Sequence, residues 1–155
     1  MKYWLMKSEP DVYSIEHLAA EIKGTAYWDG IRNYQARNFI RDDMKVGDLA
    51  FFYHSNCAEP GIVGVMEIAS AAYPDYTAFD PKEKYFDSKS EKTNPRWFMV
   101  DVKLRRKFRI SLSLKDIRLE KKLSKMKLVQ PGNRLSISPV TKIEWDHIMA
   151  MVDGD

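Results

Sequence analysis

Polar and aromatic side chains gather where the sequence predicts strand ends, turns and one helix face. The residues of this kind are Lys7, Ser8, Glu9, Trp28, Asn33, Tyr34, Arg37, Tyr53, His54, Ser55, Asn56 and Trp97. Aromatic rings stack on unpaired bases, amides and hydroxyls bond to base edges, and basic side chains meet phosphates. These residue types therefore indicate a pocket that could hold one splayed-out base of a nucleic acid. In the alternative interpretation, the two tryptophans belong to the core, and Ser55 and Asn56 only cap a turn.

Histidine and glycine patterns give little support for catalysis. The three histidines are His17, His54 and His147, and the first and last lie inside predicted amphipathic helices, where packing or solvation is the expected role. His54 has polar neighbours, but no G-x-S-x-G elbow presents a serine nucleophile. Neither a glycine-rich phosphate loop nor a cluster of metal ligands can be found in the sequence. We therefore expect no catalytic residue, no metal site and no cofactor.

Length and composition predict one folded domain spanning residues 1–155. The chain is 45% hydrophobic and has four Trp, eight Tyr and seven Phe, which is enough apolar surface for a core. Its single cysteine, Cys57, cannot form an internal disulfide, so a reducing compartment fits best. Charged residues and a proline interrupt the apolar start, and no run of about 18 apolar residues occurs. We expect no contact with a membrane and a cytoplasmic location.

Positive charge is concentrated in one part of the chain. The net charge is only +3, but residues 103–127 contain eleven Lys or Arg against two acidic residues, Asp116 and Glu120. Such a stretch is either a solvated charged face or a surface that follows a phosphate backbone. The interleaved leucines and isoleucine also need a core to pack into, so the sequence leaves both interpretations open.

Apolar runs and alternating patterns predict five strands. They lie at residues 3–7, 49–53, 62–68, 97–108 and around 135–137. The second and third strands are joined by a loop with turn signals, which carries His54 to Asn56, and we expect them to form a hairpin. Residues 73–94 are polar and show no sustained period, which predicts a long surface excursion.

One predicted helix carries an unusual polar stripe. It follows the turn signal Asp29-Gly30, and Asn33, Arg37 and Arg41 are spaced four residues apart along it. Residues with this spacing lie on the same side of an α-helix. We therefore expect these three side chains to line up along one face.

Capping signals predict the other helices. They begin after Ser14, Ser113 and Thr141, with a further short helix near residues 123–128. The apolar faces of the first and last should include Ile22 and Ile143. The order of elements lacks the alternating strand-helix rhythm of a parallel sheet. The sequence thus predicts a mixed α+β domain around a small curved sheet or barrel.

Several longer stretches of the chain resemble one known family. They are Trp4–Pro10, Trp28–Asn38, Phe52–Asn56, Glu59–Ile62, Ala72–Asp75, Asn94–Trp97 and Arg134–Ile137. Together these segments closely resemble the EVE domain family, which includes the thymocyte nuclear proteins. The resemblance extends over essentially the whole chain and depends on no single short motif.

The resemblance implies a fold, a ligand and roles for the candidate residues. The implied fold is PUA-like, a small curved β-barrel with flanking helices, and the implied ligand is a modified base, usually a modified cytosine. On this chain, Trp28 or Trp97 would stack on the base, and Ser55 and Asn56 would read its Watson–Crick edge. The residues expected to contact phosphate are Arg32, Arg37 and Arg41.

Three functional hypotheses follow. The favoured one is a non-catalytic module that reads a modified base in DNA or RNA. The second is an enzyme acting on a modified nucleoside, with His54 and Glu9 as acid-base partners. The third is a protein-interaction module. The sequence alone leaves the base modification and the choice between DNA and RNA open.

Overall fold

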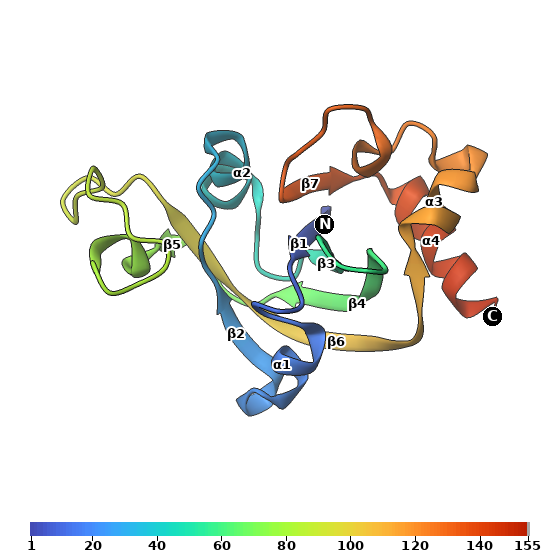
Figure 1. The fold of residues 1–155 in the computed structure, drawn as a ribbon, viewed down its shortest axis with the longest axis horizontal. Helices are drawn as coiled ribbons and strands as arrows, with labels where there is room; N and C mark the ends of the chain where they lie inside the picture. Colours follow the sequence, from blue (N-terminus) through green and yellow to red (C-terminus); the bar gives the residue numbers. More distant parts are fainter. Residues whose placement is uncertain (155) are drawn as a thin grey trace.

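The computed structural model describes residues 1–154, and its seven strands form one sheet (Figure 1). The strands are β1 (Tyr3–Ser8), β2 (Thr25–Trp28), β3 (Leu49–His54), β4 (Gly61–Ile68), β5 (Tyr73–Pro74), β6 (Phe98–Ser113) and β7 (Ile137–Val140). Their order is β2-β6-β4-β3-β1-β7, and β5 pairs with the start of β6. β1 and β3 run parallel, whereas the predicted hairpin of β3 and β4 is antiparallel. The predicted mixed α+β class and the hairpin are confirmed.

The sheet is open, which fits the predicted curved sheet and corrects the small β-barrel that the resemblance implies. Among the described residues, β2 pairs only with β6 and β7 pairs only with β1, so the two edges of the sheet do not meet. Register shifts between β4 and β6 add local twist and bend the sheet. The edge strands β2 and β7 have only four residues each. The sheet therefore curves without closing.

Four α-helices flank the sheet (Figure 1). They are α1 (Ile15–Ala20), α2 (Tyr34–Asn38), α3 (Leu114–Leu119) and α4 (Lys142–Asp153), and a π-helical turn, Phe39–Asp43, follows α2. Single 3-10 turns lie at Ile22–Gly24, Tyr76–Phe79, Lys121–Leu123 and Lys127–Val129. The predicted caps Ser14, Ser113 and Thr141 each accept a hydrogen bond from the backbone of the helix that follows. Within residues 1–154, no helix is long and apolar enough to cross a membrane.

A hydrophobic core lies on each face of the sheet. Neighbouring residues of a strand point to opposite faces, so Trp4 and Met6 of β1 belong to one core and Leu5 to the other. Phe52 and Phe51 of β3 divide in the same way. Helices α1 and α2 cover the first core, and α3 and α4 cover the second. Burial on both faces explains why these strands are continuous apolar runs rather than alternating ones.

Two expected core residues lie at the surface. Ile22 is 86% exposed, because α1 ends at Ala20 and a separate turn follows it, with Lys23 at φ 57°. Ile143 is 79% exposed, because α4 packs on the sheet through Trp145 and Ile148 instead. The caps of both helices were predicted correctly, but the helical spacing wrongly included Ile22 and Ile143 among the buried residues.

The polar stripe expected after the Asp29-Gly30 turn is interrupted. α2 has only five residues, and the π-helical turn that follows it changes the angle between successive side chains. Arg41 lies in that turn and pairs with its neighbour Asp42, with 2.8 Å between Nε and Oδ1. Asn33 precedes the helix and caps it, since its side chain accepts a hydrogen bond from the Ala36 backbone.

The segment from Asp75 to Trp97 is anchored to the body of the protein, which corrects the expectation of a purely surface excursion. Asp75, Thr77 and Ala78 are at most 1% exposed. The Asp75 backbone N–H donates to the carbonyl of Trp97 at 2.9 Å, so the segment begins and ends at adjacent points. It projects from the sheet beside β5 (Figure 1). This geometry allows the segment to form one wall of a cleft.

Candidate functional site

A cleft of about 970 Å³ lies beside the carboxyl ends of β1 and β3, between β2 and the Asp75–Trp97 segment. The two strand ends meet there because β1 and β3 are parallel neighbours. The predicted site residues that line the cleft are Lys7, Ser8, Glu9, Trp28 and Ser55. Residues that were not predicted to contact a ligand also line the cleft, including Tyr13, Tyr27, Asp29, Gly30, Tyr85, Arg134 and Ser136. A smaller depression of about 410 Å³ beside Met1 and Val140 contains none of the predicted residues.

Lys7 is a basic residue of the cleft lining. Its side chain is partly buried, and this burial lowers the pKa of the ammonium group. Its Nζ lies 5.9 Å from the centroid of the Tyr53 ring, close enough for attraction to the aromatic face. No ion pair among residues 1–154 involves Lys7. The ammonium group is therefore available to an electronegative atom of a bound molecule.

Asp29 adds a carboxyl group to the same cleft. It is partly buried, and that burial raises its pKa, with a further contribution from the negative charge of Asp75. A carboxylate accepts hydrogen bonds, and its protonated form also donates one, whereas an ammonium group only donates. Asp29 and Lys7 therefore give the cleft complementary hydrogen-bonding groups. From the sequence, Asp29 was predicted only as a turn residue.

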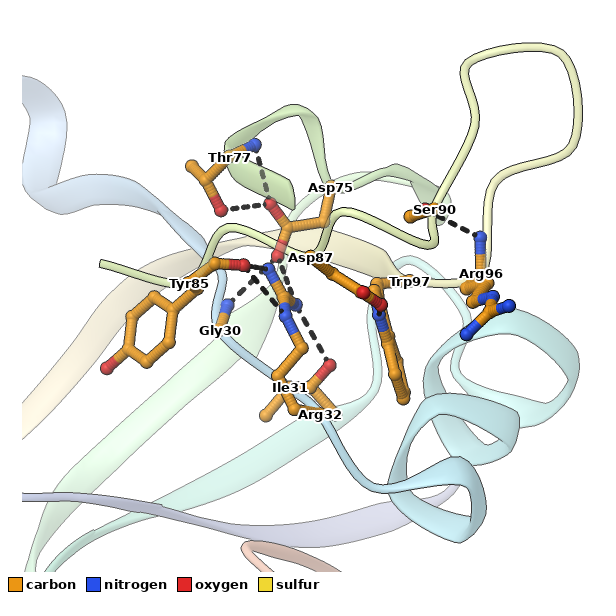
Figure 2. A network of polar contacts seen from close by, with 10 residues as sticks. All are labelled: Gly30, Ile31, Arg32, Asp75, Thr77, Tyr85, Asp87, Ser90, Arg96 and Trp97. Atoms are coloured by element: carbon orange, nitrogen blue, oxygen red, sulfur yellow. Dashed lines mark hydrogen bonds and ion pairs between the residues drawn. The ribbon is translucent and has the colours of Figure 1, made fainter. Parts of the chain in front are cut away.

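A buried carboxylate holds the cleft wall in place (Figure 2). Asp75 accepts hydrogen bonds from the backbone N–H groups of Gly30 and Thr77, each at 2.9 Å, and pairs with the Arg32 guanidinium at 3.0 Å. Arg32 in turn donates to the carbonyl of Tyr85, at 3.0 Å from Nε. The guanidinium thus connects the turn before α2 to the Asp75–Trp97 segment. Arg32, which was expected to contact phosphate, has its donors engaged inside the protein.

Trp97 belongs to a second aromatic cluster that is separate from the cleft lining. It is 6% exposed, and its ring stacks on Tyr34 with 4.9 Å between centroids. Its Nε1 donates to Asp87 at 2.6 Å (Figure 2). The Arg37 guanidinium lies 4.8 Å from the Tyr34 ring and donates to the carbonyl of Arg96 at 3.0 Å. Tyr34, Arg37 and Trp97 therefore lie together, but not with Lys7 and Trp28.

The remaining predicted residues connect the ends of β1 and β3. The Asn56 amide donates to Glu9 at 3.0 Å, and the Ser55 backbone donates to the carbonyl of Ser8 at 3.0 Å. The Ser8 hydroxyl donates to the Tyr13 carbonyl at 2.6 Å. Tyr53 is only 2% exposed. Within residues 1–154, no group of three or more His, Cys, Asp or Glu side chains is placed to hold a metal ion.

His54 lies between β3 and the start of α1. Its Nε2 accepts a hydrogen bond from the Ile15 backbone N–H at 3.1 Å, and its ring packs edge-on against Phe52. Burial lowers the pKa of His54, and the nearby negative charge of Glu16 only partly opposes this effect. The neutral ring thus accepts a hydrogen bond from one of the N–H groups that have no partner within the helix at its start.

The His54 contact predicts a pH-dependent stability. Because the folded pKa lies below the ordinary value of about 6.5, the unfolded chain binds the proton first. The stabilising contribution is complete above about pH 6.5 and is lost as the pH falls through the folded pKa. We expect the free energy of unfolding to fall between pH 7 and pH 5, measured by urea denaturation. His54→Gln should remove this part of the pH dependence, and an equal dependence in both proteins would contradict the assignment.

Comparisons with known proteins agree in pointing to one family. The family model described as "EVE domain" matches residues 2–151. Human thymocyte nuclear protein 1 is 42% identical over 99% of this chain and 75% of its own length. A crystal structure of a protein from Pseudomonas putida is 51% identical, with a TM-score of 0.92 over 97% of this chain and 99% of that protein. The crystal structure of human THYN1 protein in complex with 5-methylcytosine-containing DNA is 42% identical, with a TM-score of 0.94 over 100% of this chain and 99% of that one.

The relatives also correct one expectation. Proteins named thymocyte nuclear protein 1 from chicken and human match nearly the whole chain. That name points to the nucleus, so the expected cytoplasmic location is wrong. The resemblance noted from the sequence is confirmed by the family model and by relatives that exceed 40% identity. This chain belongs to the EVE domain family.

Proposed function

We propose that this chain is a non-catalytic reader of nucleic acid, and that its cleft holds one modified cytosine base. The observation that carries the proposal is the unpaired, partly buried Lys7 in a cleft that Trp28, Asp29 and Tyr85 also line. A volume of about 970 Å³ is ample for a nucleoside. The DNA in the human relative's crystal structure contains 5-methylcytosine, which supports this class of ligand. The open curved sheet would then be a variant of the PUA-like barrel.

The cleft chemistry matches the edge of a cytosine. Cytosine presents an exocyclic amino group, which donates, beside ring and carbonyl acceptors. Asp29 would accept from the amino group, and Lys7 would donate to an acceptor. Ser55 would add a hydroxyl contact, and Trp28 would contact the face of the base. We assign no stacking role to Trp97, since Tyr34 stacks on its ring outside the cleft.

The two residues named for the alternative enzyme hypothesis are not paired with each other. His54 Nε2 accepts a hydrogen bond from the Ile15 backbone, and the Glu9 carboxylate receives the Asn56 amide. These two side chains therefore have different partners, and no hydrogen bond joins them within residues 1–154. A general acid-base pair needs at least one group in contact with the substrate proton. Mass spectrometry of an oligonucleotide after incubation tests this point, and a changed mass would support the enzyme.

Lys7→Met tests the proposed site. We expect wild-type protein to bind an oligonucleotide with one 5-methylcytosine more tightly than its unmodified twin, measured by fluorescence anisotropy. Matched single-stranded DNA, duplex DNA and RNA identify the polymer. Loss of a charge-assisted hydrogen bond costs about 1.5–3 kcal/mol, so Lys7→Met should weaken binding of the methylated strand about 10- to 150-fold.

Lys45→Met is the matched control for Lys7→Met. Lys45 is an exposed lysine outside the cleft, and its substitution removes the same charge. It should leave the preference for the methylated strand unchanged. Equal binding of methylated and unmethylated strands by wild-type protein would overturn the proposed function. Equal weakening by both substitutions would show that Lys7 acts only through the net charge.

A further inference from the structure

The segment from Lys115 to Lys127 has a buried apolar side and an exposed basic side. Ile117, Leu123 and Met126 are at most 1% exposed and pack in the core that α4 covers. The exposed basic residues are Lys115, Arg118, Lys121, Lys122, Lys125 and Lys127, which together form the basic ridge. The apolar residues thus fill the core while the cations remain in solvent. This arrangement fits both interpretations left open by the sequence, a solvated charged face and a surface that follows a phosphate backbone.

The cations of the basic ridge form no ion pairs in the described part of the chain. None of its six residues takes part in an ion pair among residues 1–154. Three consecutive basic residues in the middle of β6 differ, because each of them has an acidic partner. These pairs are Arg105 with Glu67 at 3.4 Å, Arg106 with Asp153 at 2.7 Å, and Lys107 with Glu16 at 3.0 Å. The ridge is therefore a surface of uncompensated positive charge, which attracts polyanions.

At one end of the basic ridge, α3 lies beside the loop after β3 and near Tyr53. The Leu114 backbone donates to the carbonyl of Pro60 at 2.8 Å, which joins α3 to the loop after β3. Arg118 lies close enough to Tyr53 for its charge to oppose the rise in pKa to about 12 that burial causes in that phenol. The same Tyr53 ring lies 5.9 Å from Nζ of Lys7 in the cleft. Arg118 and Lys7 thus lie near the same aromatic ring.

The other end of the basic ridge leads into a loop that reaches the cleft. The Asn133 side chain donates to the carbonyl of Lys127, which fixes the start of this loop. Arg134 and Ser136, which follow in the chain, line the cleft. Lys7 donates through its backbone to the carbonyl of Ser136 at 2.8 Å. Each end of the ridge, Arg118 or Lys127, is thus linked through neighbouring residues to a basic residue of the cleft lining, Lys7 or Arg134.

We infer that the basic ridge binds the phosphates of the strand whose base occupies the cleft. This inference rests on the proposed function, because it assumes that a base in the cleft remains attached to its polymer. The arginines near α2 are less suited to this role. The guanidinium groups of Arg32 and Arg37 donate to carbonyls of the Asp75–Trp97 segment, and Arg41 pairs with Asp42. The six cations of the ridge, in contrast, form no ion pairs within residues 1–154.

Salt dependence of oligonucleotide binding tests the inference. Each phosphate contact contributes about 0.7 to the slope of log affinity against log salt for a single strand. The triple variant K121Q/K122Q/K125Q should therefore lower that slope by about 2, with weaker binding at low salt. The control R105Q/R106Q/K107Q removes the same number of charges from β6, where each cation already has a partner. It should change the slope much less.

The outcomes separate this inference from the proposed function. The ratio of affinities for methylated and unmethylated strands depends on the cleft, so the ridge variant should leave that ratio unchanged. A wild-type ratio of one would overturn the base-reading function. An unchanged salt slope in the ridge variant, or an equal decrease of the slope in both triple variants, would overturn the inferred phosphate binding even if the affinity ratio is unchanged. Wild-type binding that does not depend on salt would overturn it as well and point to another kind of partner.

Discussion

Replacing Asp75 with alanine is expected to lower the free energy of unfolding by about 3–5 kcal/mol, since removal of one partner from a buried ion pair costs this much. Asp75 is fully buried and accepts hydrogen bonds from the backbones of Gly30 and Thr77 and from Arg32. The substitution leaves these donors without their acceptor and leaves the Arg32 charge without its partner. Urea denaturation followed by tryptophan fluorescence measures the loss.

Asp11→Ala is the matched control for Asp75→Ala. Asp11 is an exposed carboxylate in the turn after β1, and exposed substitutions of this kind change stability by about 0.5 kcal/mol or less. Asp75→Asn keeps the shape of the side chain while removing its charge, so its free energy of unfolding should lie between those of Asp75→Ala and Asp11→Ala. If Asp75→Ala lost no more stability than Asp11→Ala, the Asp75–Trp97 segment would not depend on this anchor.

Gly30→Ala is expected to abolish the preference for a methylated strand. Gly30 has φ +79°, a conformation that costs other residues about 1–2 kcal/mol. An added Cβ would also lie 2.6 Å from the Tyr85 ring, so that ring would have to leave its place in the cleft wall. Base-aromatic contacts are worth about 1–3 kcal/mol each. We therefore expect affinity for the methylated strand to fall about tenfold or more in the anisotropy assay.

Gly47→Ala separates backbone strain from the effect on the cleft. Gly47 has φ +94°, but its Cβ would meet no atom within 4 Å, and the residue lies outside the cleft lining. This variant should lose stability through strain and still prefer the methylated strand. Tyr85→Ala should reproduce the binding loss of Gly30→Ala without its strain. Full binding by Tyr85→Ala would mean that the ring is no part of the site.

Local patterns were enough to predict much of the fold. Five of the seven strands within residues 1–154, the β3–β4 hairpin and the three helix caps were predicted, because they depend on residues close together in the chain. Ser14, for example, caps α1 three residues before its partner. The short strands β2 and β5 were not predicted. The end of α1 at Ala20 was missed because the left-handed backbone of Lys23 leaves no signal in the apolar spacing. Whether the sheet closes depends on which strands pair at its edges, and the periodicity of apolar residues in the sequence does not predict that pairing.

The candidate site was predicted only in part, for a similar reason. Lys7 lies near the end of one apolar strand and Ser55 directly follows another, and parallel pairing of these strands brings both residues to the same cleft. Asp29 has turn-forming chemistry, and only the tertiary structure reveals its partial burial near Asp75. The Arg32–Asp75 pair joins residues 43 apart in the chain, so an exposed phosphate contact was a reasonable expectation for Arg32. Whether a polar residue holds the structure together or is free to contact a ligand therefore depends on its long-range partners, which residue type alone does not predict.

The position of β1 in the sheet affects how the protein can fold during synthesis. β1 precedes the other described strands in the chain, yet it lies between β3 and β7, and β7 begins only at Ile137. Until the ribosome has released that strand, one edge of β1 has no partner, and unpaired apolar edges promote aggregation. The cleft shares this delay, because Ser136 bonds to Lys7 and Arg134 lines the opening. A nascent chain that ends before Arg134 therefore has no complete cleft.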